Sequence, residues 1–333
     1  MKRKIIYYVQ QYNPKFEAIS KEIEILHNKF PSMIYNPQDK KMRFTKKHIS
    51  FNYKHFPFPL AAIPLRGNKK IAHIYTSLGN RLYLTMVRKK PILLTGAGSA
   101  SEEKINKCIK HYKKVSHITV ESEKDRDFLF SKGFDDNKVS LVYPGIDLSR
   151  FNYSKPDDNF SILFASSPMQ KQHFHSRGVN FLLENFNECN KTKLILLWRK
   201  KYIEEIKSLI KGHNNIKLIN EFIPNIEDLY NSTHATIFPS LTYLDNKPCP
   251  HSIIESLASG KPVAVSSASG IAPLVKKEKC GVVFDTEKES FVKAMELLTK
   301  EYTHFQSKAR KTAEKYFSKE LFIKQYANIY DRI

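Results

Sequence analysis

The chain of 333 residues has few cysteines, few glycines and no long apolar run. Its four cysteines form no CxxC pair and have no histidine at metal-ligand spacing, which excludes a disulfide framework and a zinc-finger type of site. The apolar run after Lys4 stops at Gln10, too early for a signal-peptide core. No stretch reaches the roughly 20 apolar residues that span a bilayer. We therefore expect a cytoplasmic protein, peripheral at a membrane if it meets one.

Acidic residues are also scarce, since 33 Asp and Glu stand against 55 Lys and Arg, a formal net charge of +22. Residues 1–150 hold 29 of these cations and 13 of the acids, so this part carries +16. The excess predicts an anionic partner: nucleic acid, a membrane surface or a phosphorylated acceptor. No nucleic-acid-binding module is recognisable, and nucleic acid is therefore not expected to be the partner.

The segment Lys40–His48 mixes cations with aromatics, and more aromatic residues follow it. These are Phe51, Tyr53, Phe56 and Phe58. Two interpretations stay open for the segment. It is either a patch that binds an anionic membrane, with rings at the boundary, or a solvated basic loop over an ordinary core.

Short apolar runs alternate with helical patterns along the chain, and several runs are apolar on both faces, as buried parallel strands are. The strand candidates are 4–9, 71–75, 91–95, 117–120, 140–143, 161–166, 193–198, 215–219, 235–238, 262–266 and 281–284. The helical patterns are 16–30, 178–186, 204–210, 226–230 and 289–301. This alternation predicts an α/β protein with parallel sheets.

A polar segment, 154–159, follows the turn at Pro144-Gly145 and precedes a new strand. We therefore expect an N-terminal domain of residues 1–154 and a C-terminal domain of residues 155–316. The remaining residues, 317–333, have an amphipathic helical pattern. This last helix is expected to pack back toward the N-terminal domain.

The segment from Ser252 to Pro262 has the marks of a short helix. Ser252 with Glu255 three residues later is the capping-box pattern, and Gly260 suits the C-terminal end. The free N–H groups and the dipole at such a helix start favour an anion, such as a nucleotide diphosphate. Glu255 has a second interpretation, in which it does no more than cap its own helix.

Several motifs in the second half of the chain occur together in one known family. They are Val142-Tyr143-Pro144-Gly145-Ile146-Asp147 followed by Phe151, Phe238-Pro239-Ser240, the run from Pro248 to Ala264, Ser269-Gly270, and Gly281-Val282-Val283-Phe284-Asp285. In these the chain resembles the retaining GT-B glycosyltransferases of family 4, the glycosyl transferase group 1 family. The resemblance covers about 117–285. It implies two Rossmann-like domains facing across a cleft, a nucleotide-sugar donor as substrate, and neither metal nor cofactor.

The resemblance also implies roles for residues of the donor site. Glu255 matches the second Glu of the family's E-x7-E element and would bind the ribose hydroxyls. The backbone N–H groups of Ser252 and Ile253, beside His251, would face the diphosphate. Lys247 replaces the first Glu. Lys247 pairs with a phosphate or an acidic sugar, or it is a solvated loop lysine.

A leaving diphosphate needs cations when no metal is present. The family has Gly-Arg after the first strand of its C-terminal domain and Lys-Gly further on. Here Ser166-Ser167-Pro168 follows the strand, and Arg177-Gly178 stands at the Lys-Gly position. Arg177 is therefore the expected catalytic cation. Lys171 is a candidate substitute for the missing Arg, or a flexible loop lysine.

Three residues of the first half complete the candidate set. Asn13 and Glu17 follow the first strand and are expected on the acceptor side. Gly96, in Thr95-Gly96-Ala97-Gly98, either lines the donor side of the cleft or forms a tight turn. Asp125-Arg126-Asp127 resembles a DxD metal motif, but it lies in a predicted helix capped by Ser122, where carboxylates two residues apart diverge.

These observations predict transfer of a sugar from a UDP-, GDP- or ADP-sugar to a glycan, a lipid-linked acceptor or a protein, with retention of anomeric configuration. Two alternatives stay open. The first is an inactive relative that binds nucleotide sugars or lipids, suggested by Lys247 and the missing Arg. The second is a nucleic-acid-binding protein, suggested by charge alone.

Overall fold

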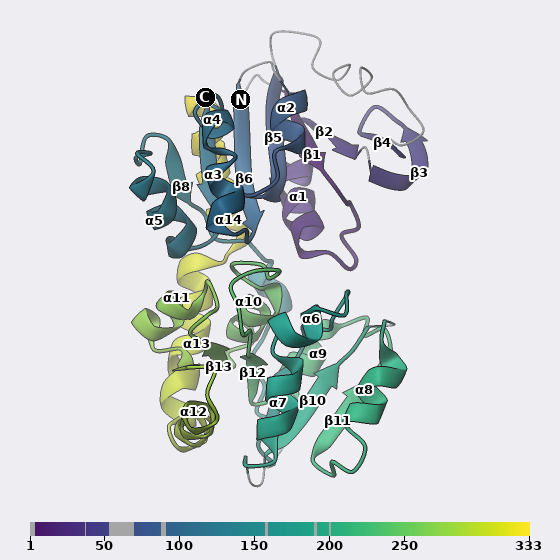
Figure 1. Ribbon diagram of the computed structural model, residues 1–333, viewed down its shortest axis with the longest axis vertical. Helices are drawn as coiled ribbons and strands as arrows, with labels where there is room; N and C mark the ends of the chain where they lie inside the picture. The colour runs from purple at the N-terminus through teal and green to yellow at the C-terminus, as the bar shows by residue number, and fades with distance from the viewer. Residues whose placement is uncertain are drawn as a thin grey trace. The chain divides into compact units, whose positions relative to one another are not determined.

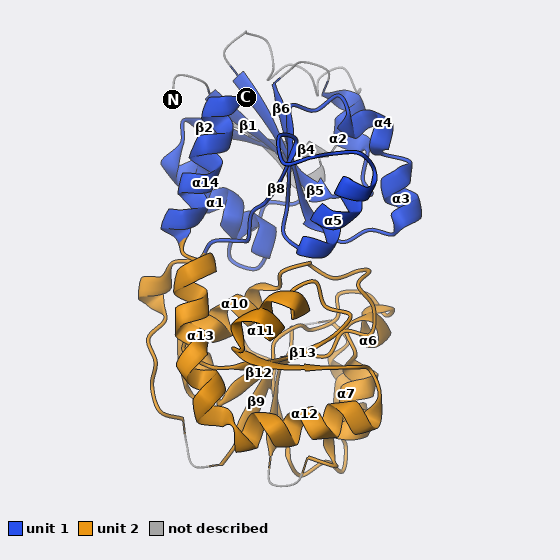
Figure 2. Ribbon diagram, turned by 90° about the vertical axis from the view of Figure 1, so that its left-hand side faces the viewer, with its two compact units in different colours: residues 1–145, 319–333 blue, residues 146–318 orange. Residues whose placement is uncertain are grey.

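The computed structural model describes residues 4–36, 38–52, 70–87, 91–156, 159–189, 192–199 and 201–333. The chain divides into two units (Figure 2), of which unit 1 comprises residues 1–145 and 319–333 and unit 2 comprises residues 146–318. Each unit is a sheet with helices packed on it (Figure 1). No helix in the described part of the chain is long and apolar enough to cross a membrane.

Unit 1 has an eight-stranded sheet in the order β3-β4-β2-β1-β5-β6-β7-β8, parallel except for β3. Its strands are β1 (Lys4–Val9), β2 (Ser32–Asn36), β3 (Gln38–Phe44), β4 (His48–Asn52), β5 (Lys70–Ser77), β6 (Ile92–Gly98), β7 (His117–Val120) and β8 (Val139–Leu141). Its helices are α1 (Ala18–Lys29), α2 (Leu82–Met86), α3 (Glu102–Asn106), α4 (Ile109–Tyr112), α5 (Glu123–Ser131) and α14 (Lys319–Arg332). Strands such as β1, buried on both faces from Ile5 to Val9, form its core.

The C-terminal helix α14 packs on unit 1 through buried tyrosines. The hydroxyl of Tyr330 lies 2.7 Å from Nδ1 of His73, and the hydroxyl of Tyr326 lies 3.0 Å from Oγ1 of Thr95. Both tyrosines are buried, so these bonds satisfy polar groups that would otherwise be costly in the core. The side chain of Phe322 packs against Gly145, where an added Cβ would lie 2.5 Å from the Cβ of Phe322.

Unit 2 has a six-stranded parallel sheet in the order β11-β10-β9-β12-β13-β14. Its strands are β9 (Ser161–Phe164), β10 (Lys193–Leu197), β11 (Ile216–Ile219), β12 (Ala235–Phe238), β13 (Val263–Ser266) and β14 (Gly281–Phe284). Its α-helices are α6 (His173–Ser176), α7 (Val179–Phe186), α8 (Ile203–Leu209), α9 (Ile226–Asn231), α10 (His251–Ala258), α11 (Ala272–Glu278), α12 (Lys288–Lys300) and α13 (Tyr302–Tyr316). This is the doubly wound Rossmann order, in which the order of the parallel strands reverses between β9 and β12.

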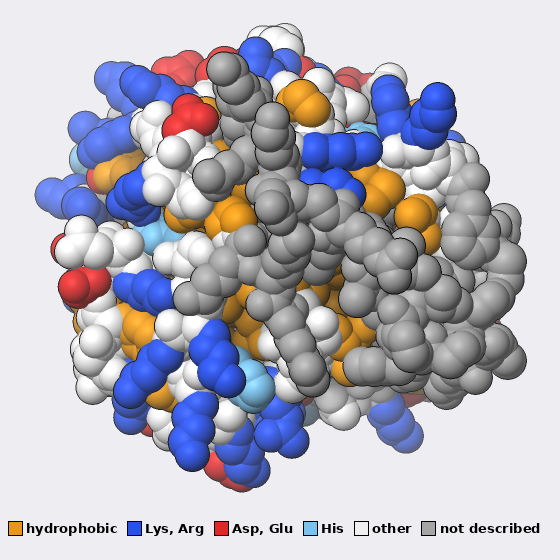
Figure 3. Space-filling model, turned by 90° about the horizontal axis from the view of Figure 1, so that it is seen from above, with side chains coloured by type: hydrophobic (Ala, Val, Ile, Leu, Met, Phe, Trp, Pro, Cys, Tyr) orange, Lys and Arg blue, Asp and Glu red, His pale blue; other side chains and the backbone are white. Residues whose placement is uncertain are grey.

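Each strand predicted from the sequence overlaps an observed one, but β2, β3 and β4 were not predicted. The basic segment 40–48 is not a loop, since it lies largely in β3 and β4, which pair antiparallel. Tyr53, Phe56 and Phe58 lie outside the described residues. On the face seen in Figure 3, Lys and Arg side chains are more widespread than Asp and Glu.

The unit boundary lies at residue 145, before the polar segment where the sequence analysis placed it. Residues 146–154 pack on unit 2. The buried ring of Phe151 meets that of Tyr230 edge-on, with centroids 6.4 Å apart. The Nζ of Lys261 donates to the carbonyl of Ser154 at 2.6 Å, and Nη1 of Arg310 donates to the carbonyl of Phe151.

Candidate functional site

The carboxyl edge of the unit 2 sheet carries most of the candidate residues. In open parallel sheets ligands bind at the carboxyl ends of the strands, at the point where the strand order reverses. The loop that follows β12 is tied to the end of β13 here, because the hydroxyl of Ser266 donates to the carbonyl of Ser240 at 2.5 Å. Helix α10 starts from the loop after β12 and therefore presents its N-terminus at this edge.

Helix α10 begins at His251, and its N-cap is Pro250 with no side-chain cap. The predicted capping box of Ser252 and Glu255 is therefore wrong. The carbonyl of Pro250 accepts the N–H of Ile253 at 3.1 Å, so the helix starts earlier and Ser252 lies inside its first turn. This bond also engages the Ile253 N–H that we expected to face a diphosphate. The N–H groups of His251 and Ser252 precede the first helical bond, as at any helix start.

The end of α10 agrees with the sequence. Gly260 follows the C-cap Ser259 in the left-handed conformation, with φ of 69°. Such a residue ends a helix at little cost only when it has no Cβ. The short helix is thus delimited by Pro250 and Gly260.

Glu255 is buried in α10, with 7% of its surface exposed. Its Oε2 accepts the hydroxyl of Tyr230, from α9, at 2.9 Å. Burial, and next the negative charge of Glu255, raise the pKa of Tyr230 well above its usual range, so the hydroxyl remains a donor. Tyr230 thus holds the carboxylate in one orientation. Tyr230 was not predicted as a site residue, because in the sequence it has no mark beyond a place on the apolar face of a short helix.

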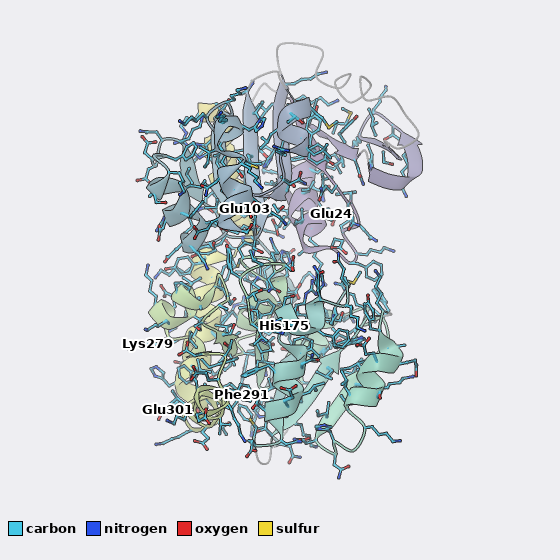
Figure 4. The ribbon with its side chains drawn as sticks, viewed as in Figure 1. Glu24, Glu103, His175, Lys279, Phe291 and Glu301 are labelled. Carbon is cyan, nitrogen blue, oxygen red and sulfur yellow. The ribbon has the colours of Figure 1, made fainter. Side chains whose placement is uncertain are left out.

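Arg177 follows α6 and precedes α7, two residues after His175, which Figure 4 labels. The position of Arg177 depends on the glycine that comes next. Gly178 has φ of 71°, and a Cβ there would lie 1.8 Å from the carbonyl oxygen of Pro239. Only glycine allows the chain to pass so close to the end of β12. Nη1 of Arg177 donates to the carbonyls of Ser167 at 2.7 Å and Ser166 at 3.4 Å, in the loop after β9.

The segment that carries Lys247 is held against the same loop. Nδ2 of buried Asn246 donates to the carbonyls of Ser176 at 3.2 Å, Thr242 at 2.9 Å and Leu244 at 3.0 Å. Lys247 follows Asn246 in the chain, and Arg177 follows Ser176. The bond between Asn246 and Ser176 therefore brings the backbone of the two cations close together. The side chain of Lys247 is half-buried, whereas that of Lys171 is exposed.

Two buried hydroxyls beside these loops lack hydrogen-bond partners within the described residues. They belong to Ser176 and Ser269, each 5% exposed. Ser269 precedes Gly270, where a Cβ would lie 2.6 Å from the carbonyl oxygen of Pro248. Buried polar groups are normally satisfied, so these hydroxyls suit a site that binds a polar ligand.

The remaining candidates belong to unit 1. Asn13 is exposed in a turn after β1, and its carbonyl accepts the N–H of Glu17, the N-cap residue of α1. Gly96 lies in β6, where a Cβ would come within 2.5 Å of the Leu78 side chain. That close packing explains this glycine without a ligand.

The helical interpretation of Asp125-Arg126-Asp127 is confirmed. These residues lie in α5, and the hydroxyl of Ser122 accepts the N–H of Asp125 at 3.1 Å as its cap. The carboxylate of Asp127 forms an ion pair with its neighbour Arg126, with Nη2 of Arg126 2.9 Å from Oδ1 of Asp127. Across the described ranges, no group of three or more His, Cys, Asp or Glu side chains is arranged to hold a metal ion.

The family described as glycosyl transferases group 1 matches residues 149–316 of the chain. No curated protein sequence matches it. Among solved structures, HepE of Anabaena in complex with UDP and glucose is 14% identical with a TM-score of 0.78, over 99% of this chain and 100% of that one. Sucrose-phosphate synthase of Thermosynechococcus elongatus is 13% identical with a TM-score of 0.78, over 99% and 98%. A glycosyltransferase of Rickettsia africae is 16% identical with a TM-score of 0.77, over 99% and 98%.

Proposed function

Because the chain belongs to the glycosyl transferases group 1 and has the GT-B fold of two Rossmann-like domains, we propose that it transfers a sugar from a nucleotide-sugar donor with retention of anomeric configuration. The observation that carries this proposal is the buried Glu255 carboxylate, held by Tyr230 in the helix that starts at the carboxyl edge of unit 2. A carboxylate with one oxygen fixed by a tyrosine can accept hydrogen bonds from two ribose hydroxyls.

Among the nucleotide sugars, a UDP-sugar is the donor that we propose first. HepE of Anabaena binds UDP and UDP-glucose, which supports this choice over GDP- and ADP-sugars. The diphosphate would lie at the start of α10, where helix N–H groups and the dipole favour negative charge. Arg177 would stabilise the charge that develops on the leaving diphosphate, as the catalytic cation. Lys247, from the same neighbourhood, would contact the sugar or a phosphate.

The retaining step would be a front-side attack. The acceptor hydroxyl forms the new bond to the anomeric carbon on the face from which the diphosphate leaves. The departing phosphate oxygen takes the hydroxyl proton, so no covalent sugar–protein bond forms. The acceptor is a glycan or a lipid-linked sugar, in the cytoplasm or at an anionic membrane surface, and Asn13 and Glu17 would lie on its side.

A panel of UDP-, GDP- and ADP-sugars, assayed for nucleotide release and sugar transfer, tests the proposal. We expect turnover with one nucleotide class, and its loss in Glu255→Gln but not in Glu289→Gln, which alters an exposed carboxylate of α12. Nucleotide binding without turnover on any acceptor would instead identify an inactive relative. A product with inverted anomeric configuration, as read from its anomeric proton signal in NMR, would refute retention.

A further inference from the structure

Near its start, unit 2 has a segment that lies against the helices of the candidate site. This segment, the strap, is residues 148–154, and it comprises the 3₁₀ turn Leu148–Arg150 and the four residues after it. Phe151 of the strap is only 3% exposed, so its ring is part of the interior of unit 2. The contacts of the strap lead to the two residues that form the buried Tyr230–Glu255 pair.

The ring of Phe151 supports the ring of Tyr230. The two rings meet edge-on, with an interplanar angle of 65° and centroids 6.4 Å apart, which is a geometry that aromatic pairs prefer. The hydroxyl of Tyr230 donates to Oε2 of Glu255 at 2.9 Å. Because a hydrogen bond weakens steeply with misalignment, a shift of the Tyr230 ring would loosen its hold on the carboxylate.

Arg310 of α13 bonds the strap to α10, the helix of Glu255. Its Nη1 donates to the carbonyls of Phe151 at 2.5 Å and Ala258 at 2.6 Å. Ala258 lies three residues after Glu255, so the two residues share one side of α10. The Nε of the same guanidinium pairs with Glu314, one turn further along α13, at 2.9 Å. One nitrogen of Arg310 thus sets how far the strap lies from the helix that carries the carboxylate.

Lys261 bonds the other end of the strap to α9, the helix of Tyr230. Its Nζ donates to the carbonyls of Ser154 at 2.6 Å and Asn231 at 3.0 Å. Asn231 is the last residue of α9 and follows Tyr230 directly. Hydrogen bonds from a charged donor are stronger than those between neutral groups. The two cations therefore hold the strap against both helices of the pair, with the ring of Phe151 between their attachment points.

We propose that Phe151 and Arg310 are positioning residues for ribose binding, because the strap keeps the Tyr230 hydroxyl on Glu255 and so orients the carboxylate. This inference rests on the proposed function, in which Glu255 accepts the ribose hydroxyls. A disturbed strap then loses affinity through those hydroxyls and not through the phosphates. The signature of this role is a loss of preference for a nucleotide that has its ribose hydroxyls over one that lacks them.

The first test measures the affinities of Phe151→Leu for UDP and for 2′,3′-dideoxy-UDP by calorimetry, with thermal unfolding as a check on folding. The variant keeps an apolar side chain but loses the edge-on ring. Its affinity for UDP should fall about three- to tenfold, as loss of an aromatic pair does, and that for the dideoxy analogue should stay within about twofold. The control is Phe186→Leu, a buried ring at the last residue of α7, which precedes the amino end of β10 and so lies away from the carboxyl edge. It should lower the melting temperature similarly and keep the parent's preference for UDP.

A second pair of variants tests Arg310. Arg310→Met removes the bonds to the strap and to α10, so it should also lower the preference for UDP over the dideoxy analogue, and Arg310→Lys should recover part of that preference. The control is Glu314→Gln, which weakens only the ion pair of the same guanidinium and should keep the parent's preference.

A double variant shows whether Phe151 acts through Tyr230. The hydroxyl is already absent from Tyr230→Phe, so adding Phe151→Leu should weaken UDP binding by less than about twofold more. Additive losses would overturn the assignment, and so would equal losses for UDP and the dideoxy analogue in Phe151→Leu and Arg310→Met. A parent protein that binds UDP no more tightly than the dideoxy analogue would instead refute the ribose contact of Glu255 in the proposed function.

Discussion

Replacing Tyr230 by phenylalanine removes the hydroxyl that donates to Oε2 of Glu255 and keeps the buried ring. The bond is 2.9 Å long, and both residues are buried. A hydrogen bond to a charged group contributes about 1.5–3 kcal/mol. We expect the free energy of unfolding to fall by about that amount, which lowers the melting temperature by about 2–4 °C per kcal/mol in a unit of this size.

The same substitution should weaken nucleotide binding through the ribose. Without the Tyr230 hydroxyl, the Glu255 carboxylate loses a bond that fixes its orientation, and a loss of about 1.4 kcal/mol corresponds to a tenfold weaker affinity for UDP. The effect should be much smaller for 2′,3′-dideoxy-UDP, which lacks the hydroxyls that Glu255 would accept. Because the pKa of Tyr230 is raised well above its usual range, the difference should not vary with pH from about 6 to 9.

Calorimetry with UDP and its dideoxy analogue, beside thermal unfolding, measures both effects. The control is Tyr302→Phe in α13, because the buried hydroxyl of Tyr302 lacks a hydrogen-bond partner within the described residues. Its removal should leave stability and UDP affinity unchanged. If Tyr230→Phe kept the parent's melting temperature and its preference for UDP over the dideoxy analogue, the role of the pair would be refuted.

Two further changes test how the site is positioned. Gly178→Ala should destabilise unit 2 and lower its affinity for UDP, because the new Cβ would lie 1.8 Å from the carbonyl oxygen of Pro239. The control is Gly212→Ala, at φ of 90° with nothing within 4 Å, which should cost only about 1 kcal/mol of backbone strain. Equal losses of stability in thermal unfolding would contradict the contact with Pro239. Burial lowers the pKa of Lys261 from 10.5 to about 8, so the unfolded chain holds this proton to a higher pH than the folded one. Stability should therefore rise between about pH 8 and 10.5 in the parent and not in Lys261→Met, as chemical denaturation at each pH would show.

Much of the sheet architecture follows from the sequence, because buried parallel strands such as β1 and β13 are short runs of apolar residues. The β3–β4 pair was missed because β3 is rich in charge and lies at the edge of the sheet, and the basic turn Thr45-Lys46-Lys47 separates it from β4. A charged edge strand resembles a solvated loop in any pattern of hydrophobicity.

The candidate site was predicted in part. The sequence places Glu255 in a short helix and Arg177 at the Lys-Gly position, and the structure brings the start of that helix and the loop of Arg177 to one edge of unit 2, while the roles of both residues stay predictions. The capping box failed because the carbonyl of Pro250 starts the helix early. Tyr230 was missed because its bond joins it to Glu255, a residue distant in sequence. No local pattern marks such a pair.

The most direct test of the central claim is the rate of UDP release from UDP-glucose, or from the best donor of the panel, by the parent and by Arg177→Gln. Our account predicts that the parent turns over and that Arg177→Gln loses about a hundred- to a thousandfold in kcat, as loss of a preorganised cation at a leaving group does. Lys193→Gln, remote from the carboxyl edge, should keep the parent's rate. A rate in Arg177→Gln equal to the parent's would contradict the claim that this edge of unit 2 is where the diphosphate leaves.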